Sequence, residues 1–141
     1  MKYQIIKVAD KSIFGKLISL FTGSKWNHLM CSLDDSQGTA AIERTPSGMY
    51  SVDLSNYRHE YEVICSGTID DREITERFIR LDTKRYDWIA TILFYINRKF
   101  KLNIGKGYDK LNCVEMVGYL LDIPELNHSV APHEAEGVLC G

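Results

Sequence analysis

The chain has 141 residues, of which 45% are hydrophobic and 26% are charged, and its formal net charge at pH 7 is −2. This composition is that of an ordinary globular protein and excludes a disordered chain. Lys and Arg are spread along the chain and leave no basic footprint, so we expect no nucleic-acid partner. The length predicts a single domain over residues 1–141 that buries its own core.

The cysteines indicate free thiols rather than a metal site or a disulfide framework. The four of them form no CxxC pair and no His/Cys cluster with zinc spacing; they are Cys31, Cys65, Cys113 and Cys140. The chain start lacks the form of a signal peptide, and the most apolar run, "WIATILFYI", is too short to span a bilayer. We therefore expect a cytoplasmic protein with no cofactor, no metal and no transmembrane segment. The oligomeric state is left open.

Strand patterns dominate the first half of the chain. "YQIIKV" (3–8) alternates like a strand, and one helical face follows from Asp10, its predicted cap. "HLMCSL" (28–33) and "TAAIER" (39–44) predict a hairpin around the turn-rich "DDSQG". Two further strands follow as "GMYSVDL" (48–54) and "YEVICSG" (61–67), and alternation in the second predicts buried Tyr61, Val63 and Cys65.

Helical patterns dominate the second half. "DDREITERFIRL" (70–81) and "YDWIATILFYIN" (86–97) each carry apolar residues at helical spacing, and a glycine-containing loop (103–110) leads into a helix that opens at Asn112. Pro132 suits the first turn of a short final helix. Strands first and helices later predict an α+β fold with a mainly antiparallel sheet and helices packed on it.

Cys113 is the first residue that chemistry could use. Asn112 is a strong N-cap type, and Glu115 follows three residues later in a variant of the capping box, so Cys113 occupies the first helical position. There the helix dipole and unpaired backbone N–H groups favour a thiolate and could stabilise an oxyanion. The alternative is a buried thiol in an apolar stripe with Met116 and Leu120.

A nucleophilic cysteine needs a base, and His28 is the best placed of four histidines. His59, His128 and His133 lie in polar or loop segments and are expected at the surface, whereas His28 begins a predicted strand. If "DDSQG" closes the hairpin about Asp35 and Ser36, His28 lies directly opposite Glu43, which could orient the imidazole. A slip of one residue would remove this contact. The alternative is a cross-strand ion pair without a catalytic role.

Three stretches together resemble a known family. "TGSKWNHLMCSL", "AAIERTPSGMYSVDL" and "NCVEMVGYLL" are similar to the circularly permuted branch of the NlpC-like papain superfamily, which includes the YiiX-like hydrolases and, more distantly, the lecithin:retinol acyltransferase relatives. In that branch the histidine precedes the cysteine. This chain departs from the pattern at Val114, where a serine is common, and in the "KWN" lead-in before His28.

The resemblance implies a permuted papain-like hydrolase with Cys113 as nucleophile, His28 as base and Glu43 as orienter. It implies cleavage of an amide bond in a peptide or small molecule through a thioacyl-enzyme. Beside it, we expect Tyr86, Asn112 and Trp26 to bind substrate; the alternative for Tyr86 is core packing ahead of an amphipathic helix. A lipid acyl hydrolase or acyltransferase on the same fold, and a catalytically silent binding module, are the competing hypotheses. A metal site is weaker, because no ligand set drawn from these cysteines and histidines has a recognised spacing.

Overall fold

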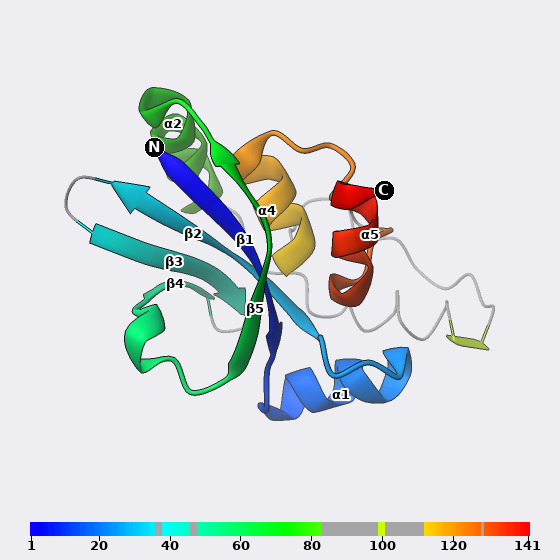
Figure 1. Ribbon diagram of the computed structural model, residues 1–141. Coiled ribbons are helices and arrows are strands. Elements are labelled where there is room, and N and C mark those ends of the chain that lie inside the picture. Colours follow the sequence, from blue (N-terminus) through cyan, green and yellow to red (C-terminus); the bar gives the residue numbers. More distant parts are fainter. Residues whose placement is uncertain (36–37, 46–47, 83–98, 101–111, 128) are drawn as a thin grey trace.

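An antiparallel sheet forms the centre of the computed structural model, which describes residues 1–35, 38–45, 48–82, 99–100, 112–127 and 129–141. Its five strands lie in the order β4-β3-β2-β1-β5 (Figure 1). Their bounds are β1 Lys2–Ala9, β2 His28–Asp35, β3 Gly38–Thr45, β4 Gly48–Val52 and β5 Glu60–Thr68. The predicted α+β class and antiparallel sheet are therefore confirmed.

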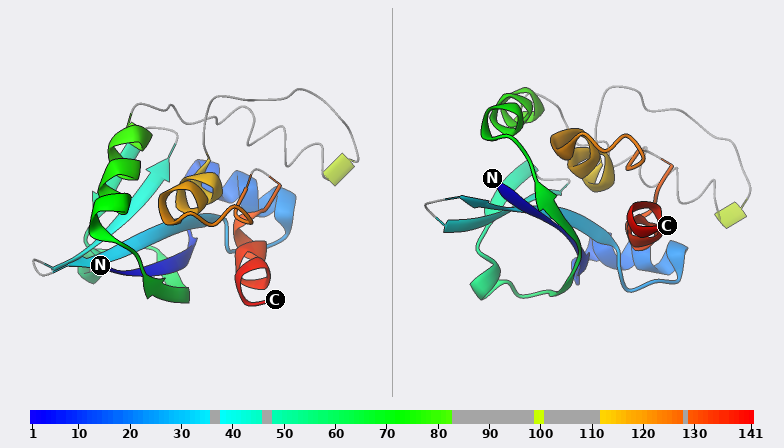
Figure 2. Two further views of the ribbon diagram at one scale, coloured as in Figure 1. Left: turned by 90° about the horizontal axis from the view of Figure 1, so that it is seen from above. Right: turned by 45° about the horizontal axis from the view of Figure 1, so that its top comes forward.

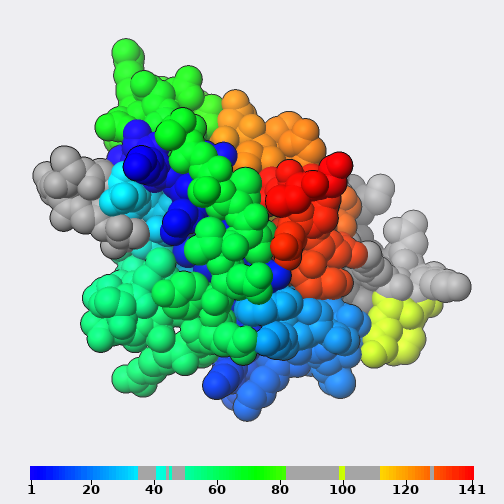
Figure 3. Space-filling model, in the orientation of Figure 1, coloured from blue at the N-terminus to red at the C-terminus, as the bar shows by residue number. Residues whose placement is uncertain are grey.

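The described helices gather on one face and at one end of this sheet. They are α1 Ile13–Thr22, α2 Asp71–Asp82, α4 Cys113–Leu121 and α5 Ala135–Cys140, with short 3-10 turns η1 Leu54–Asn56 and η2 Pro132–Glu134. The two further views in Figure 2 place α2 and α4 together over one face of the sheet. Figure 3 shows α5 against β5 and α1 along the lower edge. None of the described helices has the length and apolarity needed to cross a bilayer.

Alternation along β1 and β2 divides the apolar residues between two clusters. Ile5, Leu29 and Cys31 pack with Leu81 of α2 and with α4 in the main core. The opposite face carries a smaller cluster of Ile6, Val8, Met30 and Ala41, which is covered by Val52, Leu54 and Tyr57. Because successive side chains of a strand point to opposite faces, one strand pair serves both clusters.

The hairpin of β2 and β3 forms, but in a register that differs from the predicted one. A turn about Asp35 and Ser36 would place Cys31 opposite Ala40, whereas Cys31 lies opposite Ile42. The turn instead lies between Asp35 and Gly38, which are themselves paired. His28 is therefore not directly opposite Glu43, and that prediction is wrong. A shift of two residues keeps every side chain on its predicted face, since the side-chain period of a strand is two.

The burial predicted for the strand at 61–67 is wrong for two of its three residues. Tyr61 and Val63 are 40% and 43% exposed. The pairing of β5 with β1 shifts between Ile5, opposite Cys65, and Ile6, opposite Val63. This β-bulge interrupts the alternation, so Cys65 faces the main core while Val63 does not. Since β5 is an edge strand, its outer residues also have fewer neighbours.

Helix α1 is capped by Ser12 rather than by the predicted Asp10. The Ser12 hydroxyl accepts from the Gly15 backbone N–H at 3.1 Å, and the Asp10 carboxylate in turn accepts from the Ser12 backbone and hydroxyl. The buried Asn27 amide then joins this segment to β2, since it donates to the Gly15 and Asp10 carbonyl oxygens and accepts from the Asp10 N–H. Asn27 immediately precedes His28, so this network fixes where β2 begins.

The later elements agree with the sequence pattern where they are described. The 70–81 pattern forms α2, with Ile74 and Leu81 buried, and Pro132 opens the final turn as predicted. The predicted helix at 86–97 and the loop at 103–110 lie outside the described residues.

Candidate active site

Cys113 occupies the first position of α4, as its capping signal predicts. The Asn112 side chain accepts from the Glu115 backbone N–H at 2.9 Å, and the Glu115 carboxylate accepts from the Asn112 backbone N–H at 3.0 Å. This reciprocal capping box sets the start of α4, with Asn112 as the N-cap and Cys113 as the first helical residue. Local sequence alone therefore places a thiol at the positive end of a helix. The Cys113 side chain is buried there.

His28 lies between Cys113 and Glu43. Its Nε2 lies 3.2 Å from Oε2 of Glu43, and Cys113, which lines the same cavity, also acts electrostatically on the His28 ring. Since Nε2 faces the carboxylate, Nδ1 is the ring nitrogen left for the thiol. The Nε2–H is imperfectly aligned with Oε2, so the carboxylate contact is an ion pair rather than a well-formed hydrogen bond. The diagonal relation of the two strand positions still allows it.

The electrostatics of the three residues favour a charged imidazole. Burial of His28 opposes protonation, but Cys113 and Glu43 outweigh it and raise the pKa of His28 from 6.5 to about 10. Burial also acts against the Glu43 carboxylate, yet His28 and the Tyr57 hydroxyl hold the pKa of Glu43 below its ordinary value. Cys113 and Glu43 therefore both favour the charged form of His28, which a thiolate–imidazolium pair requires.

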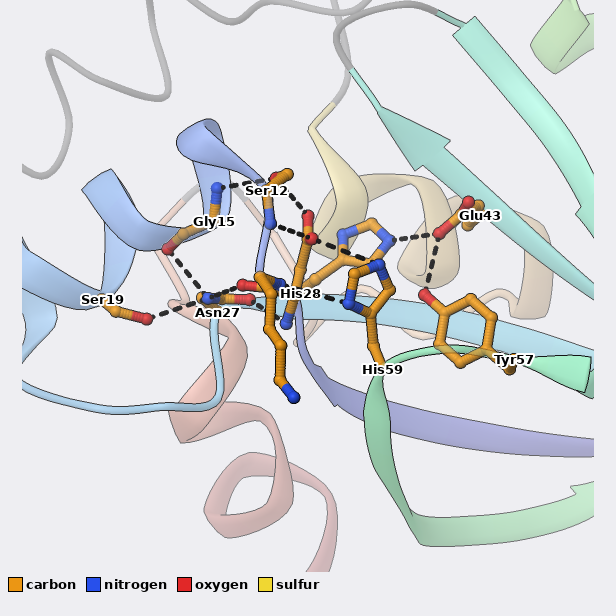
Figure 4. A network of polar contacts seen from close by, with 10 residues as sticks. Ser12, Gly15, Ser19, Asn27, His28, Glu43, Tyr57 and His59 are labelled. Atoms are coloured by element: carbon orange, nitrogen blue, oxygen red, sulfur yellow. Dashed lines mark hydrogen bonds and ion pairs between the residues drawn. The ribbon is translucent and has the colours of Figure 1, made fainter.

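A cavity of about 440 Å³ opens onto this group and brings in residues that the sequence interpretation missed. Besides Cys113, His28 and Glu43, its lining includes Asp10, Tyr57 and His59, and an apolar wall from α1 formed by Ile13, Phe14 and Ile18. Figure 4 shows His28, Glu43, Tyr57 and His59 converging from β2, β3 and the segment after η1. Tyr57 and His59 come from a separate part of the chain, and no local pattern linked them to His28 and Glu43.

His59 departs most from its prediction as a surface residue. Its side chain is only 29% exposed, and Nδ1 accepts from the Lys11 backbone N–H at 3.2 Å. Nε2 lies 3.6 Å from the Asp10 carboxylate. His133 is also 29% exposed, and His128 lies outside the described residues. The "NYRHEY" stretch is polar, but the fold turns one of its residues inward.

The predicted substrate-binding residues are not gathered at the cavity. Trp26 is absent from the described lining, and the ammonium groups of Lys7 and Lys25 lie 4.9 and 4.6 Å from the centroid of its ring. The Asn112 side chain is occupied by the capping box. Tyr86 lies outside the described residues. Among the residues that the structure describes, no three metal-binding side chains cluster.

Comparison with known proteins adds no family to this geometry. No protein-family model matches the chain, and no curated protein is significantly similar to it.

Proposed function

We propose that this protein is a cysteine hydrolase of the circularly permuted NlpC-like papain type, which cleaves an amide bond in a peptide or small molecule. The observation that carries the proposal is that His28 lies 3.2 Å from Glu43 and shares a cavity with Cys113, which acts electrostatically on its ring. These supply the nucleophile, the base and the orienter, and they open onto one cavity. A histidine that only stabilised the fold would not need a thiol at a helix N-terminus on one side and a carboxylate on the other.

The first half-reaction uses the ion pair directly. The Cys113 thiolate attacks the substrate carbonyl carbon, and the C–O π electrons move onto oxygen to give a tetrahedral oxyanion. When this collapses, the C–N bond breaks, the imidazolium of His28 gives its proton to the leaving amine, and a thioester to Cys113 remains. Glu43 keeps the imidazole oriented and stabilises its charged form.

The start of α4 can stabilise the oxyanion. The N–H groups of Glu115 and Met116 are bonded to Asn112, whereas those of Cys113 and Val114 have no acceptor among the described residues. They can therefore donate to a substrate oxygen. In the second half-reaction, neutral His28 takes a proton from water, which attacks the thioester. The carboxylic acid leaves, and the thiolate–imidazolium pair is restored.

A second candidate function is hydrolysis or transfer of lipid acyl groups on the same fold. The wall of Ile13, Phe14 and Ile18 favours it, because an apolar surface beside the nucleophile suits an acyl chain. A catalytically silent binding module remains the outcome if the thiol proves ordinary.

The proposal is tested by iodoacetamide alkylation of each cysteine against pH, read by mass spectrometry of the separate peptides. The exposed Cys140 is a control within the same chain. At pH 6 an ordinary thiol with a pKa of about 8.5 is almost wholly protonated. A Cys113 that His28 holds as a thiolate should therefore react roughly 100-fold faster at this pH than an ordinary thiol. His28→Ala should abolish the excess.

Either result directs the next step. A low-pH reactivity of Cys113 that depends on His28 leads to paired assays with peptide amides and long-chain acyl esters, which separate the two candidate reactions. If Cys113 follows the pH profile of Cys140, or is unreactive in both proteins, the hydrolase proposal fails.

A further inference from the structure

Tyr57 touches the same carboxylate oxygen that faces His28. Its hydroxyl donates to Oε2 of Glu43 at 3.2 Å, and Nε2 of His28 lies 3.2 Å from that oxygen (Figure 4). Tyr57 follows η1 in the chain and belongs to neither β2 nor β3, the strands that carry His28 and Glu43. One atom of Glu43 therefore joins a third segment of the chain to the candidate catalytic group.

The position of Tyr57 is itself well determined. Asp53 caps η1 by accepting from the Ser55 N–H at 2.9 Å, and the Tyr57 backbone N–H donates to the Leu54 carbonyl. The Tyr57 ring packs against the small apolar cluster of the sheet. The ring makes T-shaped contacts with those of His59 and Tyr61, with centroids 5.3 and 6.0 Å away. A ring held on several sides can act as a fixed donor.

Glu43 needs such a donor because it is not directly opposite His28. The hairpin register places the two residues diagonally, so the Glu43 side chain has to reach along the strand. A glutamate has several rotatable bonds, and without an anchor its carboxylate would sample positions away from the imidazole. Burial also disfavours its ionised form, which an additional donor supports.

We propose that Tyr57 is a positioning residue for this site, which holds the Glu43 carboxylate ionised and aimed at His28. The inference rests on the proposed function, because Tyr57 acts through Glu43 on the pair of His28 and Cys113. Among the residues that the structure describes, the other titratable groups that line the same cavity are Asp10, after β1, and His59, before β5. Tyr57 is the one of these that donates a hydrogen bond to Glu43.

The sign of the expected effect follows from this chain of contacts. Tyr57→Phe keeps the ring and removes the donor, so Glu43 is less firmly ionised and less firmly placed. A weaker carboxylate partner makes the imidazolium less stable, and the thiolate of Cys113 loses support. The pH at which half of Cys113 becomes reactive should therefore rise by about 0.5 to 1 unit. This corresponds to a pair of Cys113 and His28 that is about threefold to tenfold less stable.

The experiment measures the pH profile of Cys113 alkylation in Tyr57→Phe, with Tyr61→Phe as the matched control. Tyr61 is a neighbouring ring that contacts Tyr57, and its loss of a hydroxyl should leave the midpoint unchanged. In the Glu43→Gln background, Tyr57→Phe should produce no further shift, because its effect passes through the carboxylate. A merely structural role would change access to Cys113 at all pH values and leave the midpoint in place.

The outcomes separate this inference from the proposed function. If the unaltered protein has no low-pH thiolate, the proposed function fails. If it has one, and Tyr57→Phe leaves the midpoint unchanged or shifts it equally without Glu43, the role of Tyr57 is refuted. Should Tyr57→Phe unfold the protein, site-specific 4-aminophenylalanine is compared with 4-methylphenylalanine at position 57. The first can donate and should retain the midpoint, and equal midpoints would again refute the role.

Discussion

The ion pair of His28 and Glu43 leads to a prediction that needs no substrate. In a Cys113→Ala background, the thiol partner of His28 is absent and Glu43 is the remaining group that raises the pKa of His28. Replacing Glu43 with Gln then removes the charge but keeps the length of the side chain and an oxygen for Tyr57. Only burial is left to act on His28, and burial lowers the pKa of a histidine.

The size of the change can be estimated from the separation of the charges. At 3.2 Å, two unit charges attract by about 5 kcal/mol if the effective dielectric constant is about 20. Solvent reaches 17% of the Glu43 side chain, and the Gln oxygen still faces Nε2, so the net effect is smaller. We expect the pKa of His28 to fall by about 2 units, within the usual range for a close opposite charge. In the double variant it should lie below 6.5.

The assay is an NMR titration of the His28 ring signals in Cys113→Ala and in Cys113→Ala/Glu43→Gln. Glu60→Gln in the Cys113→Ala background is the control, since it removes one negative charge that pairs at the surface with Lys25. That control should leave the His28 titration unchanged. A pKa for His28 that stays the same or rises when Glu43 is neutralised would refute the ion pair and, with it, the assignment of Glu43 as the orienter.

Two predictions concern stability. Gly118→Ala should lower the free energy of unfolding by about 1–3 kcal/mol, because the added methyl group would overlap the backbone carbonyl oxygen of Leu126. Gly137→Ala is its control, has open space and should be neutral or slightly stabilising. Asn27→Ala should cost about 3 kcal/mol, since it leaves one buried and two partly buried backbone groups without their partner, whereas the exposed Asn56→Ala should cost under about 0.5 kcal/mol. Urea unfolding measures all four, and equal effects within either pair would contradict the packing and bonding described.

Local signals in the sequence determined the parts of the site that depend on neighbours in the chain. The capping box around Cys113 joins residues three apart, so its residues alone predict both the helix start and the position of the thiol. The alternation of β2 and β3 predicted that His28 and Glu43 share a face. That prediction survived a register error of two residues because the side-chain period of a strand is also two.

Only the tertiary structure decided how distant segments meet. The exact register depended on where the turn closes, and the bulge in β5 reversed the burial predicted for Tyr61 and Val63. Tyr57 contacts Glu43, and His59 lies inward at the same cavity. Neither the helical nor the strand periodicity of the sequence predicts these long-range positions. Such contacts depend on how the whole chain packs, because the free energy that places these side chains comes from the shared core and not from their own sequence neighbours.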